Sequence, residues 1–317
     1  MSSLPANATG DAYEEAFKLA GQLGEVVLIQ RAPPWSDFVP NGSISNRTER
    51  LTRLEKDLAR RNNLKLFLAV DPTDPADRGR MASVPSSLSG KDFSDGNLRS
   101  AFISYSKYLA LNYKPAYMAV GVEVDLFYTA KGDAAFRNFQ SVYFEAYDAI
   151  KSESEDTVVF PTFQYENMNG ILRQDSRQPL WGLLARFEPK IDMVALSSFP
   201  NSVYPVVSQL PADYYTALKS RTSKPIALTS VGWSSATRPG DIGAEGVAEQ
   251  TEYVTRLLGQ SESIDARMVL WYLGQDRKLD GGVPDALSGM GLFDADAKQK
   301  QSGLTWRIYS DRPAETT

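Results

Sequence analysis

The residues of this chain most able to do chemistry are carboxylates and hydroxyls that follow short apolar segments. Glu123 comes directly after the apolar segment 116–122, and its neighbours Val122 and Val124 are apolar. Apolar surroundings disfavour the charged form of a carboxyl group, which suits a general acid. The alternative is a loop carboxylate that faces solvent, or a structural ion pair, for instance with Arg31. The position alone leaves both interpretations open.

Two absent residue types limit this chemistry. The chain contains no histidine and no cysteine, which excludes Ser-His-Asp and Cys-His catalysis, the usual structural zinc sites and disulfide bonds. Catalysis would have to use carboxylates, hydroxyls, Lys, Arg or an ion with oxygen ligands. We therefore expect no metal and no cofactor. Asp71 opens a segment with two Asp-Pro pairs, a pattern that favours turns over cation binding.

Composition indicates a soluble, well-cored protein. Hydrophobic residues make up 42% of the 317 residues and charged residues 23%, which is the ordinary globular range. No apolar run approaches the roughly 18 residues of a membrane-spanning helix. A net charge of -5 argues against a nucleic-acid partner, since such binding depends on clustered Lys and Arg. The first ten residues have no signal-peptide pattern, and the oligomeric state is not predicted.

Seven short apolar segments alternate with longer amphipathic ones and predict a parallel sheet with crossover helices. The segments are 25–30, 64–70, 116–122, 157–163, 192–199, 225–230 and 267–273. This many repeats favours one α/β domain over residues 1–317, a (β/α)8 TIM-type barrel, with poorly ordered tails at 1–10 and 311–317. The first strand of such a barrel would be missing or irregular, because residues 1–10 resemble a loop. The turn-rich segment 78–96 is typical of a binding rim.

Four phrases in the order "GVEVD", "SSFP", "KPIALTSVGWSS" and "VLWYLGQD" resemble clan A of the glycoside hydrolases, nearest the family 53 endo-galactanase branch. The resemblance implies an acid/base Glu at the end of strand four, matched by Glu123, and a nucleophilic Glu at the end of strand seven, where this chain has Ser230. It also departs from the family at Val122, which replaces an Asn, and at Ser198 and Phe199, which replace tyrosines.

In such barrels the substrate contacts residues at the carboxyl ends of the strands. Aromatic rings there stack on the apolar faces of sugars, and polar side chains bind hydroxyl groups. The predicted substrate-binding residues are Arg31, Trp35, Asp71, Asp125, Gln164, Tyr165, Glu166, Phe199, Trp233, Trp271 and Asp276.

A serine cannot replace the nucleophile, because a retaining glycosidase needs two carboxylates about 5–5.5 Å apart. An inverting route would need Glu166, Asp125 or Asp276 as the base. The sequence thus predicts a glycoside-hydrolase-like barrel that acts on or binds a β-linked polysaccharide and is inactive or strongly impaired. The alternatives are a non-catalytic carbohydrate-binding pseudoenzyme and a structural or assembly barrel. Since polysaccharides are met outside the membrane, we expect an exported protein whose leader is absent from this chain.

Overall fold

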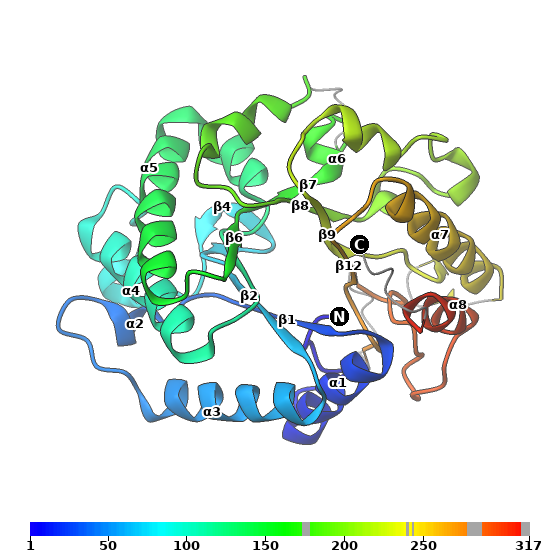
Figure 1. Cartoon of the computed structure of the whole chain (residues 1–317), viewed down its shortest axis with the longest axis horizontal. Coiled ribbons are helices and arrows are strands. Elements are labelled where there is room, and N and C mark those ends of the chain that lie inside the picture. Colours follow the sequence, from blue (N-terminus) through cyan, green and yellow to red (C-terminus); the bar gives the residue numbers. More distant parts are fainter. Residues whose placement is uncertain (173–177, 239–240, 243, 278–286, 312–317) are drawn as a thin grey trace. The chain divides into compact units, whose positions relative to one another are not determined.

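The computed structural model describes residues 1–311 apart from 173–177, 239–240, 243 and 278–286 (Figure 1). The chain divides into two compact units. Unit 1 comprises Met1–Val27, Asn62–Leu64 and Ser198–Thr317, and unit 2 comprises Leu28–Arg61 and Lys65–Ser197. The prediction that residues 1–317 form a single domain stays a prediction, and residues 312–317 of the expected tail lie outside the described residues.

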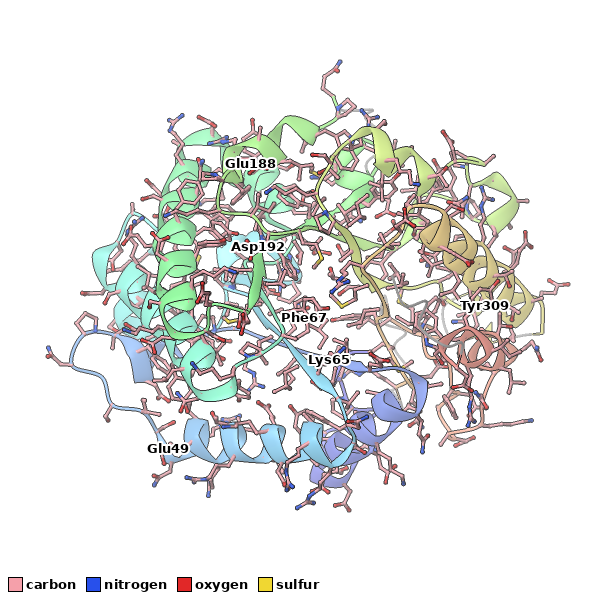
Figure 2. The ribbon with its side chains drawn as sticks, in the orientation of Figure 1. Glu49, Lys65, Phe67, Glu188, Asp192 and Tyr309 are labelled. Atoms are coloured by element: carbon pink, nitrogen blue, oxygen red, sulfur yellow. The ribbon has the colours of Figure 1, made fainter. Side chains whose placement is uncertain are left out.

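Unit 2 is built on parallel strands with helices outside them, as Figure 1 shows for α3, α4 and α5. Its strands are β1 (Val26–Arg31, which begins in unit 1), β2 (Lys65–Val70), β5 (Tyr117–Val120), β6 (Val158–Phe160), β7 (Thr162–Gln164) and β8 (Val194–Ser198). β5 pairs in parallel with both β2 and β6, and β7 pairs in parallel with β8. Phe67 of β2 is buried in this core, whereas Lys65 at the start of the strand is exposed (Figure 2).

The predicted crossover helices are observed in unit 2. The helices are α2 (Trp35–Phe38), α3 (Asn46–Arg61), α4 (Gly96–Tyr113), α5 (Val124–Glu153) and α6 (Tyr165–Met168), with 3-10 turns η1 (Ser86–Leu88) and η2 (Trp181–Phe187). Asp95 caps α4 by accepting hydrogen bonds from two backbone N–H groups of the first turn. The apolar stripe of α4 from Leu98 to Leu109 is buried, as expected for a helix that packs on a sheet.

One predicted strand is divided in two. Segment 157–163 forms β6 and β7, which are separated by Pro161. Proline has no N–H group to donate to a neighbouring strand, so the ladder is interrupted there. The segment between β2 and α4 contains a short antiparallel hairpin of β3 (Thr73–Asp74) and β4 (Asp77–Met81).

Unit 1 contains the parallel pair β9 (Ile226–Val231) and β12 (Met268–Trp271). Its other elements are α1 (Gly10–Leu23), α7 (Ala244–Ser263), α8 (Gln301–Ser310), the two-stranded β10 (Ala236–Arg238) and β11 (Asp241–Ile242), and 3-10 turns η3 (Pro200–Ser202), η4 (Val207–Gln209) and η5 (Thr216–Ser220). Trp306 of α8 donates a hydrogen bond to the Leu23 carbonyl at the end of α1, 2.8 Å away, which ties these two helices together.

The N-terminal residues take the place where a first strand was expected to be missing or irregular. The Met1 amino group donates to the Val26 carbonyl at 2.8 Å, and the Ser2 N–H donates to the Tyr272 carbonyl at 3.1 Å. These contacts form a short extended link rather than a full strand. The prediction of a loose tail over residues 1–10 is wrong for Met1 and Ser2, which are buried and hydrogen-bonded.

Candidate functional site

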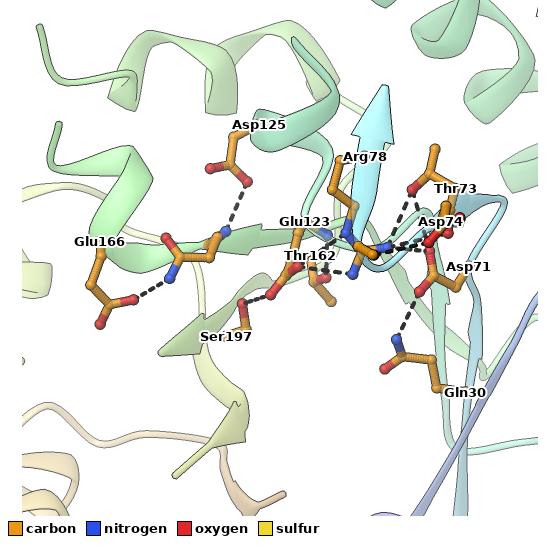
Figure 3. A network of polar contacts seen from close by, with 12 residues as sticks. Gln30, Asp71, Thr73, Asp74, Arg78, Glu123, Asp125, Thr162, Glu166 and Ser197 are labelled. Carbon is orange, nitrogen blue, oxygen red and sulfur yellow. Dashed lines mark hydrogen bonds and ion pairs between the residues drawn. The ribbon is translucent and has the colours of Figure 1, made fainter. Parts of the chain in front are cut away.

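A row of polar side chains follows the carboxyl ends of the strands in unit 2 (Figure 3). Arg78 lies at its centre and donates from Nη1 to Asp71 Oδ1 at 2.7 Å and from Nη2 to Glu123 Oε2 at 2.8 Å. The Gln30 amide donates to the other oxygen of Asp71 at 2.8 Å, and the Ser197 hydroxyl donates to Glu123 Oε1 at 2.7 Å. These side chains thus form one hydrogen-bonded row. They come from β1, the end of β2, the β3–β4 hairpin, the end of β5, and β8.

Strand register brings these residues together. Val70 and Val120 are partners in the β2–β5 ladder, so the residues that follow each strand emerge at the same edge of the sheet. Glu123 then leaves β5 through Gly121, whose φ is +100°. A Cβ atom at Gly121 would lie 2.5 Å from Phe139, so both the backbone conformation and the packing require glycine. The Glu123 N–H donates to Thr162 Oγ1 at 2.9 Å, which fixes the direction in which its side chain leaves.

The surroundings predicted for Glu123 are wrong. Its carboxylate does not lie among apolar groups but accepts hydrogen bonds from Arg78 and Ser197. Val122 and Val124 are buried, while the Glu123 side chain is 15% exposed. The side chain is thus part of an ion pair with Arg78, and its role as the acid/base stays a prediction.

The side chains of Asp71 and Arg78 have little exposure to solvent, 4% and 8%. Burial raises the pKa of Asp71, and the neighbouring Arg78 opposes this effect. For Arg78, burial lowers the pKa, but the two carboxylates outweigh burial and raise it, so the guanidinium stays charged. Two carboxylates therefore share one cation in a site that has little access to water.

A second cluster fixes the turn from β7 into α6. The Asp125 carboxylate accepts hydrogen bonds from the Gln164 N–H and from Asn167 Nδ2, both at 2.8 Å. The Gln164 side chain donates to Glu166 and accepts from the Asn167 N–H at 2.6 Å. Three predicted substrate-binding residues, Asp125, Gln164 and Glu166, thus contact one another while being 0–4% exposed. Their described contacts are structural.

Burial raises the pKa of Asp125 to about 7, although hydrogen bonds from Asn167 and Gln164 oppose the shift. Between about pH 4 and pH 7 the Asp125 carboxyl group is therefore protonated in the folded protein, whereas it is ionised in the unfolded protein. We expect the free energy of unfolding to fall as the pH rises from about 4 towards 7, because the proton is then lost at a cost to the folded state.

Urea unfolding across this pH window measures the effect. The Asp125→Asn variant should lose this component of the pH dependence, whereas Asp148→Asn, an exposed carboxylate on the same helix, should keep it. A fall of equal size in both variants would contradict the assignment to Asp125.

The remaining predicted residues of unit 2 lie among the helices. Arg31 forms an ion pair with the fully buried Glu55 of α3. Trp35 is 1% exposed and donates from Nε1 to the Ala82 carbonyl at 2.7 Å. Tyr165 is 3% exposed, and its ring meets Trp181 edge to face. None of these three joins the row around Glu123 through a contact described above.

Ser230, at the position of the family nucleophile, lies in unit 1 near the end of β9. Its hydroxyl donates to the carbonyl of the preceding residue, Thr229, at 2.8 Å, and the side chain is half-buried. The ring of Phe199, also in unit 1, packs edge to face on Tyr272 with centroids 5.8 Å apart.

The other predicted residues of unit 1 are packed in its core. Trp233 is 2% exposed and Trp271 is fully buried, so neither ring offers a face on which a sugar could stack. Asp276 forms a buried ion pair with Lys300, with Oδ2 and Nζ 2.7 Å apart. The substrate-binding roles predicted for these three residues have no support from their surroundings, because each side chain is enclosed by protein.

Sequence reasoning missed Gln30, Arg78, Thr162 and Ser197. A signal existed for two of them. Successive side chains of a strand point to opposite faces, so Gln30 and Ser197 point to the face opposite that of the predicted Arg31 and Ser198. Arg78 begins the turn-rich segment that was expected to form a rim. Nothing in the sequence tied it to Glu123.

Two further observations bear on ligands. Within the described part of the chain, no group of three or more His, Cys, Asp or Glu residues is placed to hold a metal ion. Nor does any helix in that part have the length and apolar character needed to cross a membrane.

Comparison with known proteins gives a match in structure but not in sequence. No protein-family model matches the chain, and no curated protein matches its sequence. A GH5_18 protein of Streptomyces cattleya, solved in complex with Manβ1-4GlcNAc, matches with a TM-score of 0.71 and 18% identity over 100% of this chain and 80% of that one.

A GH53 structure and a galactanase structure also match. The GH53 catalytic domain of Ignisphaera aggregans does so with a TM-score of 0.61 and 12% identity over 92% of this chain and 86% of that one. A fungal β-1,4-galactanase has a TM-score of 0.60 and 16% identity over 93% and 90%. The predicted fold is therefore confirmed: the chain has the α/β fold of the clan A glycoside hydrolase barrels.

Proposed function

We propose that this chain binds a β-1,4-linked oligosaccharide at the row around Glu123 and does not hydrolyse it. The observation that carries the proposal is the ion pair of Glu123 with the buried Arg78. The Glu123 carboxylate accepts two hydrogen bonds from the Arg78 guanidinium and one from the Ser197 hydroxyl. Hydrogen bonds to an ionised group are stronger than those between neutral groups, which suits a site that binds polar ligands.

The same row suits a ligand rich in hydroxyl groups. A carboxylate has about four acceptor positions, and Glu123 uses three of them, one for Ser197 and two for Arg78. The remaining position on Oε1 can accept a hydrogen bond from a sugar hydroxyl. A charge-assisted hydrogen bond of this kind contributes about 1.5–3 kcal/mol.

The resemblance to clan A supports the second half of the proposal. It places Ser230 where those enzymes have the nucleophilic Glu, and a neutral hydroxyl cannot form or stabilise the glycosyl intermediate in its place. The linkage is proposed from the structural neighbours, one bound to Manβ1-4GlcNAc and one a β-1,4-galactanase. Export from the cell is part of the proposal, because such saccharides are met outside the membrane.

Calorimetric titration with β-1,4-mannotetraose and β-1,4-galactotetraose tests the proposal, with the α-linked maltotetraose as the control ligand. We expect saturable binding of at least one β-linked ligand. Glu123→Gln keeps the shape of the side chain but removes its charge, and should weaken that binding by tenfold or more, as expected for loss of about 1.5–3 kcal/mol.

Glu145→Gln is the matched control, because Glu145 is 53% exposed and lies on the outer helix α5. It should bind like the parent chain. Failure of both β-linked ligands to bind, or equal losses in the two variants, would overturn the proposed site.

A further inference from the structure

A cavity of about 480 Å³ lies in unit 2 beyond the end of β1, among helices α2, α3 and α4. Its lining combines apolar and hydroxyl-bearing side chains and includes Pro34, Leu51, Tyr105, Tyr108 and Tyr113. Binding pockets for small molecules commonly have volumes of roughly 300–1,000 Å³. This cavity is therefore large enough for one small ring-shaped ligand.

Tyr105 is the one described tyrosine of this lining whose hydroxyl has no described hydrogen-bond partner. The residue is 3% exposed, and its ring packs on Phe38 with centroids 5.1 Å apart. By contrast, the Tyr108 hydroxyl lies 2.9 Å from Thr52 Oγ1, and the Tyr113 hydroxyl donates to Glu55 at 2.6 Å. The Tyr105 hydroxyl lines the cavity and can donate to a ligand bound there.

The acidic groups around the cavity already accept hydrogen bonds. Asp37 accepts hydrogen bonds from Ser45 Oγ at 2.8 Å and Thr48 Oγ1 at 2.6 Å. Glu55 is paired with Arg31, and the lining residue Arg47 is exposed to solvent. An uncharged ligand therefore enters without having to displace these partners, at the lowest desolvation cost.

We propose that this cavity binds a single neutral pyranose ring, with the Tyr105 hydroxyl donating a hydrogen bond to a ring substituent. A pyranose has apolar C–H faces, which match Pro34 and Leu51, and hydroxyl groups at its edge, which match the tyrosines. Burial raises the pKa of Tyr105 to about 12. Its hydroxyl therefore keeps its proton at neutral pH and is available as a donor.

This cavity is separate from the row around Glu123, and the inference does not rest on the proposed function. The alternation of side chains along β1 separates the two: Gln30 points to Asp71 in the row, whereas Arg31 points to Glu55 of α3 beside the cavity. The two sites can therefore be tested independently.

The test follows tyrosine ring signals by NMR. The whole chain is labelled with [ζ-13C]tyrosine and titrated with methyl β-D-mannopyranoside and methyl β-D-galactopyranoside. Tyr105→Phe removes only the hydroxyl and identifies the Tyr105 signal by its disappearance. We expect the Tyr105 signal to shift saturably with at least one glycoside. The Kd, followed through Tyr108, should rise roughly three- to tenfold in Tyr105→Phe, as expected for one neutral hydrogen bond.

Two further variants make the result specific. Leu51→Trp, which fills the cavity from a half-buried wall position, should abolish the shift. Tyr117→Phe, on β5 and outside the cavity lining, should leave it unchanged. An unmoved Tyr105 signal at the highest soluble concentration of either glycoside would overturn the proposal, as would an unchanged Kd in Tyr105→Phe. Persistence of the shift in Glu123→Gln would show that it does not depend on the row around Glu123.

Discussion

Replacement of Arg78 by methionine is expected to lower the free energy of unfolding by about 3–5 kcal/mol. The guanidinium is the cation shared by Asp71 and Glu123, and all three side chains are at most 15% exposed. Its removal leaves two neighbouring carboxylates with no cation between them. The cost arises mainly from the charges that remain buried, because methionine fills much of the same volume.

Arg80 provides the matched control, since it lies on the same strand β4 but is 69% exposed and pairs with Asp74. The Arg80→Met variant should lose less than about 1 kcal/mol, as is usual for a surface ion pair. Urea unfolding of both variants gives the comparison. Equal losses would contradict the central place of Arg78, and adding Glu123→Gln to Arg78→Met should recover part of the loss, because it removes one unpaired charge.

Introduction of a carboxylate by Ser230→Glu is expected to produce hydrolysis of β-1,4-linked oligosaccharides. In clan A sites the two carboxyl groups lie about 5–5.5 Å apart. We expect Ser230→Glu to release reducing ends about 100-fold faster than the parent chain, or more. Even a displacement of a catalytic group by about 1 Å can lower the rate by that factor, and the parent chain has no carboxylate at this position.

The matched control is Ser202→Glu, an exposed position of η3 in the same unit. It adds the same charge away from a strand end and should release no reducing ends. If the parent chain and Ser230→Glu cleave the substrate equally fast, the nucleophile lies elsewhere. If neither cleaves it, Ser230 does not occupy the position that the resemblance implies.

The strands were predictable because a parallel strand buried on both faces must be apolar along its length. Segment 64–70, for example, corresponds to β2 nearly residue for residue. The break at Pro161 could also have been anticipated, because a proline lacks the donor that a ladder requires. The two carboxylates Asp71 and Glu123 were found for the related reason that each directly follows a predicted strand.

Their partner could not be found in this way. Arg78 reaches Glu123 across 45 positions of sequence through the β3–β4 hairpin, and no local pattern encodes that contact. The surroundings of Glu123 were therefore misjudged from its neighbours in the sequence, because the contact with Arg78 comes from a distant segment. For the same reason Trp233 and Trp271 were expected at a binding surface, whereas packing places both in the core.

One NMR experiment on the parent chain tests both binding and cleavage of a β-1,4-linked oligosaccharide. β-1,4-Mannotetraose and β-1,4-galactotetraose are each incubated with the protein, and saturation transfer and anomeric proton signals are followed together. We expect saturation transfer to at least one of them, reduced in Glu123→Gln, with no growth of new reducing-end signals. Steady growth of those signals with protein concentration, or no saturation transfer to either ligand, would overturn the proposal that the chain binds such a saccharide without cleaving it.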